Sequence, residues 1–211
     1  LTSSRGLCGG YNTGVLRAAV GHLDSEVAKG VENDVYMVGK KGISFFRFLR
    51  RPMLEQITHI GDAPRFEQVE PIANALMDRF IKGEVSAVYA VYMRFYSAGR
   101  QRPAVMQLLP LTNEAGGKVT DGKKSTVQYE FSPSAEELLA ELLPATVRVR
   151  LFQCFTDATV SEQIGRMVAM KAATEAAAEM ITALTRKYNR ARQTQITMEL
   201  LDIVGGANAL A

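Results

Sequence analysis

Residues 173–204 read ATEAAAEMITALTRKYNRARQTQITMELLDIV, and this stretch decides the fold. It contains no proline or glycine, and it is dominated by the residues that lose least on entering a helix. Extended back to Pro144, the run has a single internal glycine, Gly165. A continuous helix of this length would measure roughly 90 Å. A compact domain built from the preceding residues has a diameter of only ~35 Å. The sequence therefore predicts a long helix that projects from a globular domain.

One face of this predicted helix carries an apolar stripe. Its members follow at steps of three, four or seven residues, the spacing of a coiled coil. They are Ala173, Ala177, Met180, Leu184, Tyr188, Ala191, Met198 and Leu201. An isolated helix cannot bury such a stripe, so the pattern predicts a partner for it.

A basic collar accompanies the stripe. It consists of Arg186, Lys187, Arg190 and Arg192, and no acidic residue lies between residues 179 and 199. The collar fits a solvated helix face, and it also fits a surface that meets an acidic protein loop or nucleic acid. The spacing of the basic residues alone does not decide between these two interpretations.

The composition is that of an ordinary soluble globular protein. The chain has 211 residues, of which 47% are hydrophobic and 22% charged, and its net charge is +3. That charge is too small to indicate a nucleic-acid binder. No run free of charged residues is long enough to span a membrane. The two cysteines, Cys8 and Cys154, suit a reducing compartment, and no signal peptide is seen at the start.

The first 131 residues alternate strand and helix patterns, which predicts an α/β sheet domain. A glycine-rich turn at residues 6–14 precedes a helix with Val15, Leu16, Ala19, Leu23 and Val27 on its inner side. Strands are predicted at 34–38, 56–61, 85–95 and 102–111. Helices are predicted at 40–50, with Leu49 inward, and at 66–82. The glycine turn lacks the spacing of a dinucleotide or P-loop motif, so a structural turn is favoured and phosphate binding is the alternative.

The remainder divides into a loop and the helical part of the chain. Residues 112–125 predict a surface loop and 126–131 a brief extended piece. A capping box begins at Ser134, and Pro144 predicts a kink or restart of the helix that follows. We therefore expect an α/β domain at residues 1–131 and a helical shaft at 132–211.

No catalytic constellation is visible. His22 and His59 have no metal-binding neighbours in sequence, and Cys8 has no base in view. The sequence predicts a protein that is not catalytic by itself and has no metal or cofactor.

Three segments carry a family resemblance. They read SRGLCGGYN at residues 4–12, SEQIGRMVAMKAAT at 161–174, and YNRARQ at 188–193 followed by Ile196, Thr197, Glu199 and IVGGA at 203–207. Together they closely resemble the gamma subunit of the F-type rotary ATP synthase, and the resemblance covers essentially the whole chain.

The resemblance implies a Rossmann-like α/β open-sheet domain that does not bind nucleotide, followed by a long C-terminal helix. In the family this helix forms half of an antiparallel coiled coil with an N-terminal helix. Here that N-terminal helix and most of the first strand are expected to be missing. Gly165 stands where the family usually has alanine, and it could soften the helix by up to ~1 kcal/mol. Asp202 stands where glutamate is common.

The resemblance also implies partners and site residues. The alpha and beta subunits of the catalytic hexamer would meet Arg190, Arg192, Gln193, Thr197, Glu199 and Asp202. Arg166 would support coupling lower on the shaft. Tyr129 and Glu130 would contact the epsilon subunit and the ring of c subunits.

The implied function is that of the central-stalk rotor, which couples ion-driven rotation of the membrane ring to ATP synthesis or hydrolysis. The driving ion is a proton or sodium. The implied location is the cytoplasmic face of the bacterial inner membrane, where the subunit is peripheral. Two other readings remain: a nucleotide-binding α/β enzyme with a dimerising helix, and a nucleic-acid binder with a basic helix.

Overall fold

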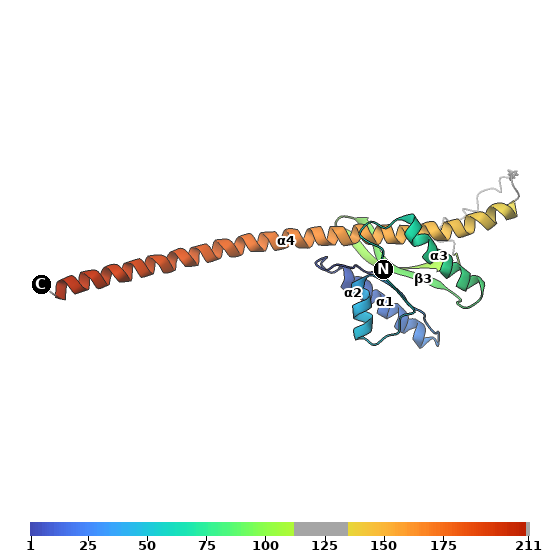
Figure 1. Ribbon diagram of the computed structural model, residues 1–211, viewed down its shortest axis with the longest axis horizontal. Helices are drawn as coiled ribbons and strands as arrows, with labels where there is room; N and C mark the ends of the chain where they lie inside the picture. The colour runs from blue at the N-terminus through green and yellow to red at the C-terminus, as the bar shows by residue number, and fades with distance from the viewer. Residues whose placement is uncertain (112–134, 210–211) are drawn as a thin grey trace, which may run out of the picture. The chain divides into compact units, whose positions relative to one another are not determined.

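The structure is a computed structural model that describes residues 1–111 and 135–209 (Figure 1). Within these ranges the chain forms, in order, α1 (Tyr11–Ala28), β1 (Tyr36–Val38), α2 (Lys40–Phe48), β2 (Glu55–Ile57), α3 (Phe66–Ile81), β3 (Val88–Ser97), β4 (Arg100–Leu109) and α4 (Ala135–Ala209). The predicted mixture of strands and helices with a long C-terminal helix is confirmed. The predicted loop and extended piece at 112–131, and the cap at Ser134, lie outside the described residues. Pro144 lies inside α4, which does not restart there.

The chain forms two compact units, Leu1–Arg166 and Met167–Ala211, which we call the α/β unit and the C-terminal unit. This division differs from the expected boundary at residues 131 and 132. The reason is that the α4 residues between 147 and 158 belong to the core of the α/β unit. The division into a foot at 1–131 and a shaft at 132–211 stays a prediction about function.

Two small sheets form the centre of the α/β unit. β1 pairs with β2 in parallel, and β3 pairs with β4 in antiparallel register. The first residues of the chain contact both sheets. The amine of Leu1 donates to the carbonyl of Val91 at 2.6 Å, and the N–H of Thr2 donates to the carbonyl of Val38 at 2.9 Å. Residues 1 and 2 therefore connect the two sheets through backbone hydrogen bonds.

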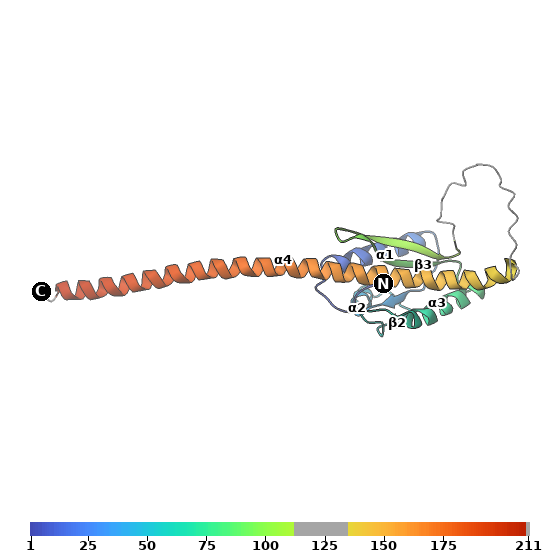
Figure 2. The same cartoon turned by 90° about the horizontal axis from the view of Figure 1, so that it is seen from above.

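The core of the α/β unit lies where α4 meets α3 and the hairpin. Its fully buried members from these elements include Val69, Tyr92, Leu108 and Cys154. Apolar burial of this kind is the main source of stability. The hydroxyl of Ser161, which is also fully buried, donates to the carbonyl of Met93 at 3.2 Å. This part of α4 is thus an integral element of the domain (Figure 2).

Two expected core positions prove to be exposed. Val27 is 62% exposed, because the buried residues of α1 are confined to its N-terminal half, at Tyr11, Val15 and Leu16. Leu49 is 39% exposed, because α2 ends at Phe48 and Leu49 is the residue at which the chain leaves the helix. Helical periodicity placed both residues on inner faces, but the packing does not extend to these helix ends.

Gly165 of α4 allows the glycine-rich turn to approach the helix backbone. A Cβ added at Gly165 would lie 2.9 Å from the carbonyl oxygen of Cys8, closer than real contacts permit. The same oxygen accepts a hydrogen bond from the N–H of Tyr11 at 3.3 Å, so it is held by the start of α1. Glycine at this position therefore serves a close backbone approach, besides any effect on helix stiffness.

Gly165→Ala and Gly21→Ala are expected to change stability in opposite directions. Alanine is favoured over glycine in a helix by up to ~1 kcal/mol. At Gly21 in α1 nothing lies within 4 Å of an added Cβ, so stability should rise. At Gly165 the overlap with Cys8 should outweigh the gain and lower the melting temperature. Thermal unfolding of both variants measures this, and a stabilised Gly165→Ala would contradict the close approach.

Candidate functional site

The C-terminal unit presents its side chains to solvent. Nearly every described residue from 167 to 208 is exposed, the half-buried Ala169 being the exception. The larger members of the apolar stripe are more than half exposed: Met180, Leu184, Tyr188, Met198 and Leu201. So much exposed apolar surface on one helix face marks an interaction surface.

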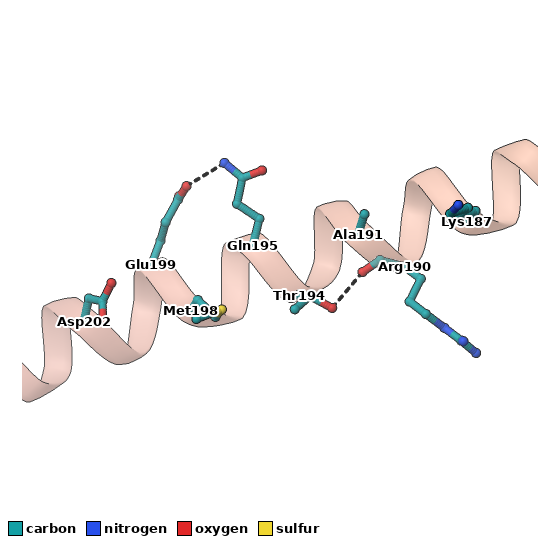
Figure 3. Close-up of a pocket in the computed structure, with 8 residues that line it drawn as sticks. All are labelled: Lys187, Arg190, Ala191, Thr194, Gln195, Met198, Glu199 and Asp202. Carbon is teal, nitrogen blue, oxygen red and sulfur yellow. Dashed lines mark hydrogen bonds between the residues drawn. The ribbon is translucent and has the colours of Figure 1, made fainter.

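A shallow groove runs along this stripe near its C-terminal end (Figure 3). It is lined by Lys187, Arg190, Ala191, Thr194, Gln195, Met198, Glu199 and Asp202. Two stripe residues, Ala191 and Met198, form its apolar floor, and charged side chains of both signs flank them. The groove therefore combines an apolar contact surface with polar groups that can fix the register of a partner.

The hydrogen bonds within this segment are local. The amide of Gln195 donates to Glu199 at 3.0 Å, on the side of the helix opposite to the Arg190 side chain in Figure 3. The hydroxyls of Thr194 and Thr197 donate to backbone carbonyls four residues earlier, at 3.0 and 2.9 Å. No ion pair involves the basic collar within residues 1–111 and 135–209. Its guanidinium groups are consequently available to an external partner.

The structure brings the predicted hexamer-contact residues together on one helix but on different faces. Arg190, Glu199 and Asp202 line the groove. Arg192 follows Arg190 by two residues, which places it about 200° around the helix. Gln193 and Thr197 are four residues apart, so they share a face. The predicted site is thus a band around the helix, and it suits a partner that surrounds it.

Arg166 belongs to the α/β unit and is held within its own helix. Its guanidinium pairs with Glu162 at 2.5 Å and donates to Gln163 at 2.8 Å. The hydrogen bond that Arg166 donates to the Glu162 carboxylate raises the pKa of Arg166 above its usual value. Arg166 is therefore fixed in place and permanently charged. The two other predicted contact residues, Tyr129 and Glu130, lie outside the described residues.

The cysteines and His22 are held in packed surroundings that do not point to catalysis. Cys8 and Cys154 are free thiols, and both are buried. Burial raises the pKa of the Cys154 thiol to about 12, which keeps it protonated and unreactive. His22 stacks edge-on against Tyr89 with 4.7 Å between ring centres. In the part of the chain that the structure describes, no group of His, Cys, Asp and Glu could hold a metal ion, and no helix could cross a membrane.

Sequence reasoning missed a cluster on the hairpin. Arg94 and Arg100 both approach the ring of Tyr96. The sequence does show Arg94 near the end of one strand and Arg100 and Arg102 at alternate positions of the next. Their meeting at one ring depends on the strand register, which only the structure gives.

Comparison with known proteins gives a consistent result. The ATP synthase family model matches residues 1–210. The ATP synthase gamma chain of Rhodopirellula baltica is 41% identical over all of this chain and 72% of its own length. That of Desulforudis audaxviator is 43% identical with the same coverage.

Solved structures share the fold. In the Euglena gracilis mitochondrial ATP synthase, in the structure described as OSCP/F1/c-ring, one chain matches with a TM-score of 0.66 and 19% identity. The match covers 99% of this chain and 70% of that one. A chain of the Tetrahymena thermophila mitochondrial ATP synthase central stalk and c-ring gives a TM-score of 0.60 and 20% identity, over 82% and 74% of the two chains.

An α/β unit continued by an exposed, apolar-striped helix defines a subunit that works inside a larger assembly. The chain belongs to the ATP synthase gamma chain family. Its function is that of the central-stalk rotor subunit of the F-type ATP synthase.

Proposed function

We propose that the C-terminal unit meets the alpha and beta subunits of the catalytic hexamer through the band of residues from 186 to 202. The observation that carries this proposal is the full exposure of the band, whose basic side chains have no carboxylate partner in the described chain. A desolvated arginine with a carboxylate partner forms a strong, geometrically specific contact. Arg192 and Gln193 supply donors on adjacent positions, and Arg190, Thr197, Glu199 and Asp202 complete the band.

The mechanism that follows is mechanical. The helix presents different side chains to different directions, so each orientation makes different contacts with the surrounding subunits. A rotor of this kind can shift the nucleotide affinity of each site only through such differential contacts. The subunit itself performs no chemistry, and ion flow through the c-subunit ring supplies the work.

The remaining contacts of the proposal involve Arg166, Tyr129 and Glu130. Arg166 is an immobilised charge that supports coupling lower on the shaft. Tyr129 and Glu130 are proposed to meet the epsilon subunit and the c ring, because their segment resembles the part of the family's gamma subunits that makes these contacts. These contacts would hold the subunit peripherally at the cytoplasmic face of the bacterial inner membrane, with protons or sodium as the coupling ion.

The Arg192→Ala, Gln193→Ala double variant tests the band. Each hydrogen bond to a charged group contributes roughly 1.5–3 kcal/mol, so ATP-driven ion pumping by the reconstituted complex should fall at least about tenfold. The control is Arg47→Ala with Gln56→Ala, which removes the same two side-chain types from exposed positions of the α/β unit. Unchanged assembly, ATP hydrolysis and pumping in the double variant would overturn the assignment.

A further inference from the structure

The end of the β3–β4 hairpin, the pair of green strands in Figure 2, carries an unusual concentration of positive charge. Arg94 of β3 stands directly opposite Arg102 of β4, and Arg100 is paired with Ser97 at the turn. All three arginines are exposed. Like charges placed directly opposite each other destabilise a hairpin. Without a binding partner, this arrangement therefore destabilises the hairpin.

Tyr96 orders two of these arginines. The guanidinium carbon of Arg94 lies 5.5 Å from the centre of the Tyr96 ring, and that of Arg100 lies 5.3 Å from it. Stacking on an aromatic ring restrains a guanidinium without neutralising its charge. Both groups keep their hydrogen-bond donors available for a carboxylate, and little side-chain freedom remains to be lost on binding.

Only some arginines of the α/β unit form ion pairs within the described residues. Arg5, Arg51, Arg79, Arg148 and Arg166 each pair with an Asp or Glu of the unit. Within residues 1–111 and 135–209, none of the three hairpin arginines has such a partner. Within the described residues this cluster therefore has no carboxylate partner, and it differs from other unpaired arginines, such as Arg17 and Arg47, because its three members stand together at one end of a hairpin.

We propose that the arginine–tyrosine end of the hairpin, formed by Arg94, Tyr96, Arg100 and Arg102, is a docking surface for an acidic protein segment. The segment carries at least two Asp or Glu side chains and belongs to a neighbouring subunit of the assembly. Restrained guanidinium groups match paired carboxylates in charge and in hydrogen-bond geometry.

Other occupants fit the surface less well. A nucleic acid would need stacking on the aromatic ring, but the Tyr96 ring already has guanidinium groups against it. A membrane surface would need apolar anchors, and the turn offers only Ser97, Ala98 and Gly99. Residues 112–134 of this chain hold three carboxylates and three lysines, so that segment has no net negative charge.

Photo-crosslinking in the purified complex tests the surface. The probe p-benzoylphenylalanine replaces Ala98, an exposed residue of the hairpin turn. The expected adduct joins the probe at position 98 to an Asp- and Glu-rich peptide of another subunit. The Arg94→Glu, Arg102→Glu double variant should reduce the adduct at least about fivefold. The two glutamates would also stand opposite each other and repel, so the variant does not relieve the like-charge repulsion within the hairpin.

Two matched variants separate charge from geometry. Arg47→Glu with Arg50→Glu makes the same charge change at exposed positions at the end of α2, which packs against β1 and α1, and should leave the adduct intact. Arg94→Lys with Arg102→Lys keeps the positive charge but removes the planar guanidinium groups that can bind a carboxylate through two hydrogen bonds. An intermediate adduct yield is therefore expected. The proposal is overturned by an adduct that charge reversal leaves unchanged, by an adduct to lipid, nucleic acid or residues 112–134, or by no adduct in the assembled complex.

Discussion

Replacing Gly39 by Ala is expected to lower the free energy of unfolding of the α/β unit by about 3 kcal/mol or more. Gly39 has a φ of +94°, a conformation that side-chain-bearing residues rarely adopt. A Cβ there would lie 2.1 Å from the carbonyl oxygen of Thr2. The glycine cannot move away easily, because its N–H donates to Ile57 and its carbonyl accepts from Ile43. Urea unfolding followed by circular dichroism measures the loss.

Gly61→Ala is the matched control for Gly39→Ala. Gly61 has no heavy atom within 4 Å of an added Cβ, and its φ lies outside the left-handed region. Its substitution should change stability by less than ~0.5 kcal/mol, as at ordinary surface positions. Equal effects of the two substitutions would show that the junction of β1, α2 and residues 1–3 is not packed as described.

The second large effect is expected on assembly. Met180→Glu with Leu184→Glu places two charges on the apolar stripe, where the native side chains are 65% and 59% exposed. The α/β unit should keep its stability, because these side chains contribute nothing to its core. Burying each native side chain against a partner would contribute roughly 1.5–3 kcal/mol to the binding free energy. The affinity of the subunit for the rest of the complex should therefore fall at least about a hundredfold, as measured by co-purification across a concentration series.

The control for the stripe lies on the opposite face of the same helix. Ala178→Glu with Thr182→Glu adds the same charges at the same spacing, and both positions are exposed. If this pair disrupts assembly as strongly as the stripe pair, then the apolar stripe is not the surface that packs against a helix in the assembled rotor.

Much of the fold follows from local patterns in the sequence. Residues 66–82 and 173–204 have helical periodicity and few helix breakers, and both are helical in the structure. Pro144 was the exception. It costs a hydrogen bond in a helix interior, yet α4 continues through it. Val147 and Leu151, just beyond the proline, are buried in the core and hold the helix in place. Tertiary packing overrode the local signal.

The site was predictable in composition but not in geometry. The sequence showed that the residues from 186 to 202 combine basic side chains with an apolar stripe. The family resemblance supplied their proposed role as contacts to the catalytic hexamer. The sequence could not show that the glycine-rich turn rests on Gly165, because the contact joins residues more than 150 positions apart. It also could not bring Arg94 and Arg100 to one ring, since that depends on strand register. Long-range contacts account for both gaps.

Single-molecule rotation tests the central claim most directly. Glu32→Cys, at an exposed position, can carry a probe, while the native Cys8 and Cys154 are buried and should resist labelling. With the catalytic hexamer fixed to a surface and ATP supplied, the probe on this chain should turn in one direction, and turning should stop when ATP is removed. A complex that hydrolyses ATP at its normal rate while the probe stays still would contradict the account of this chain as the rotor.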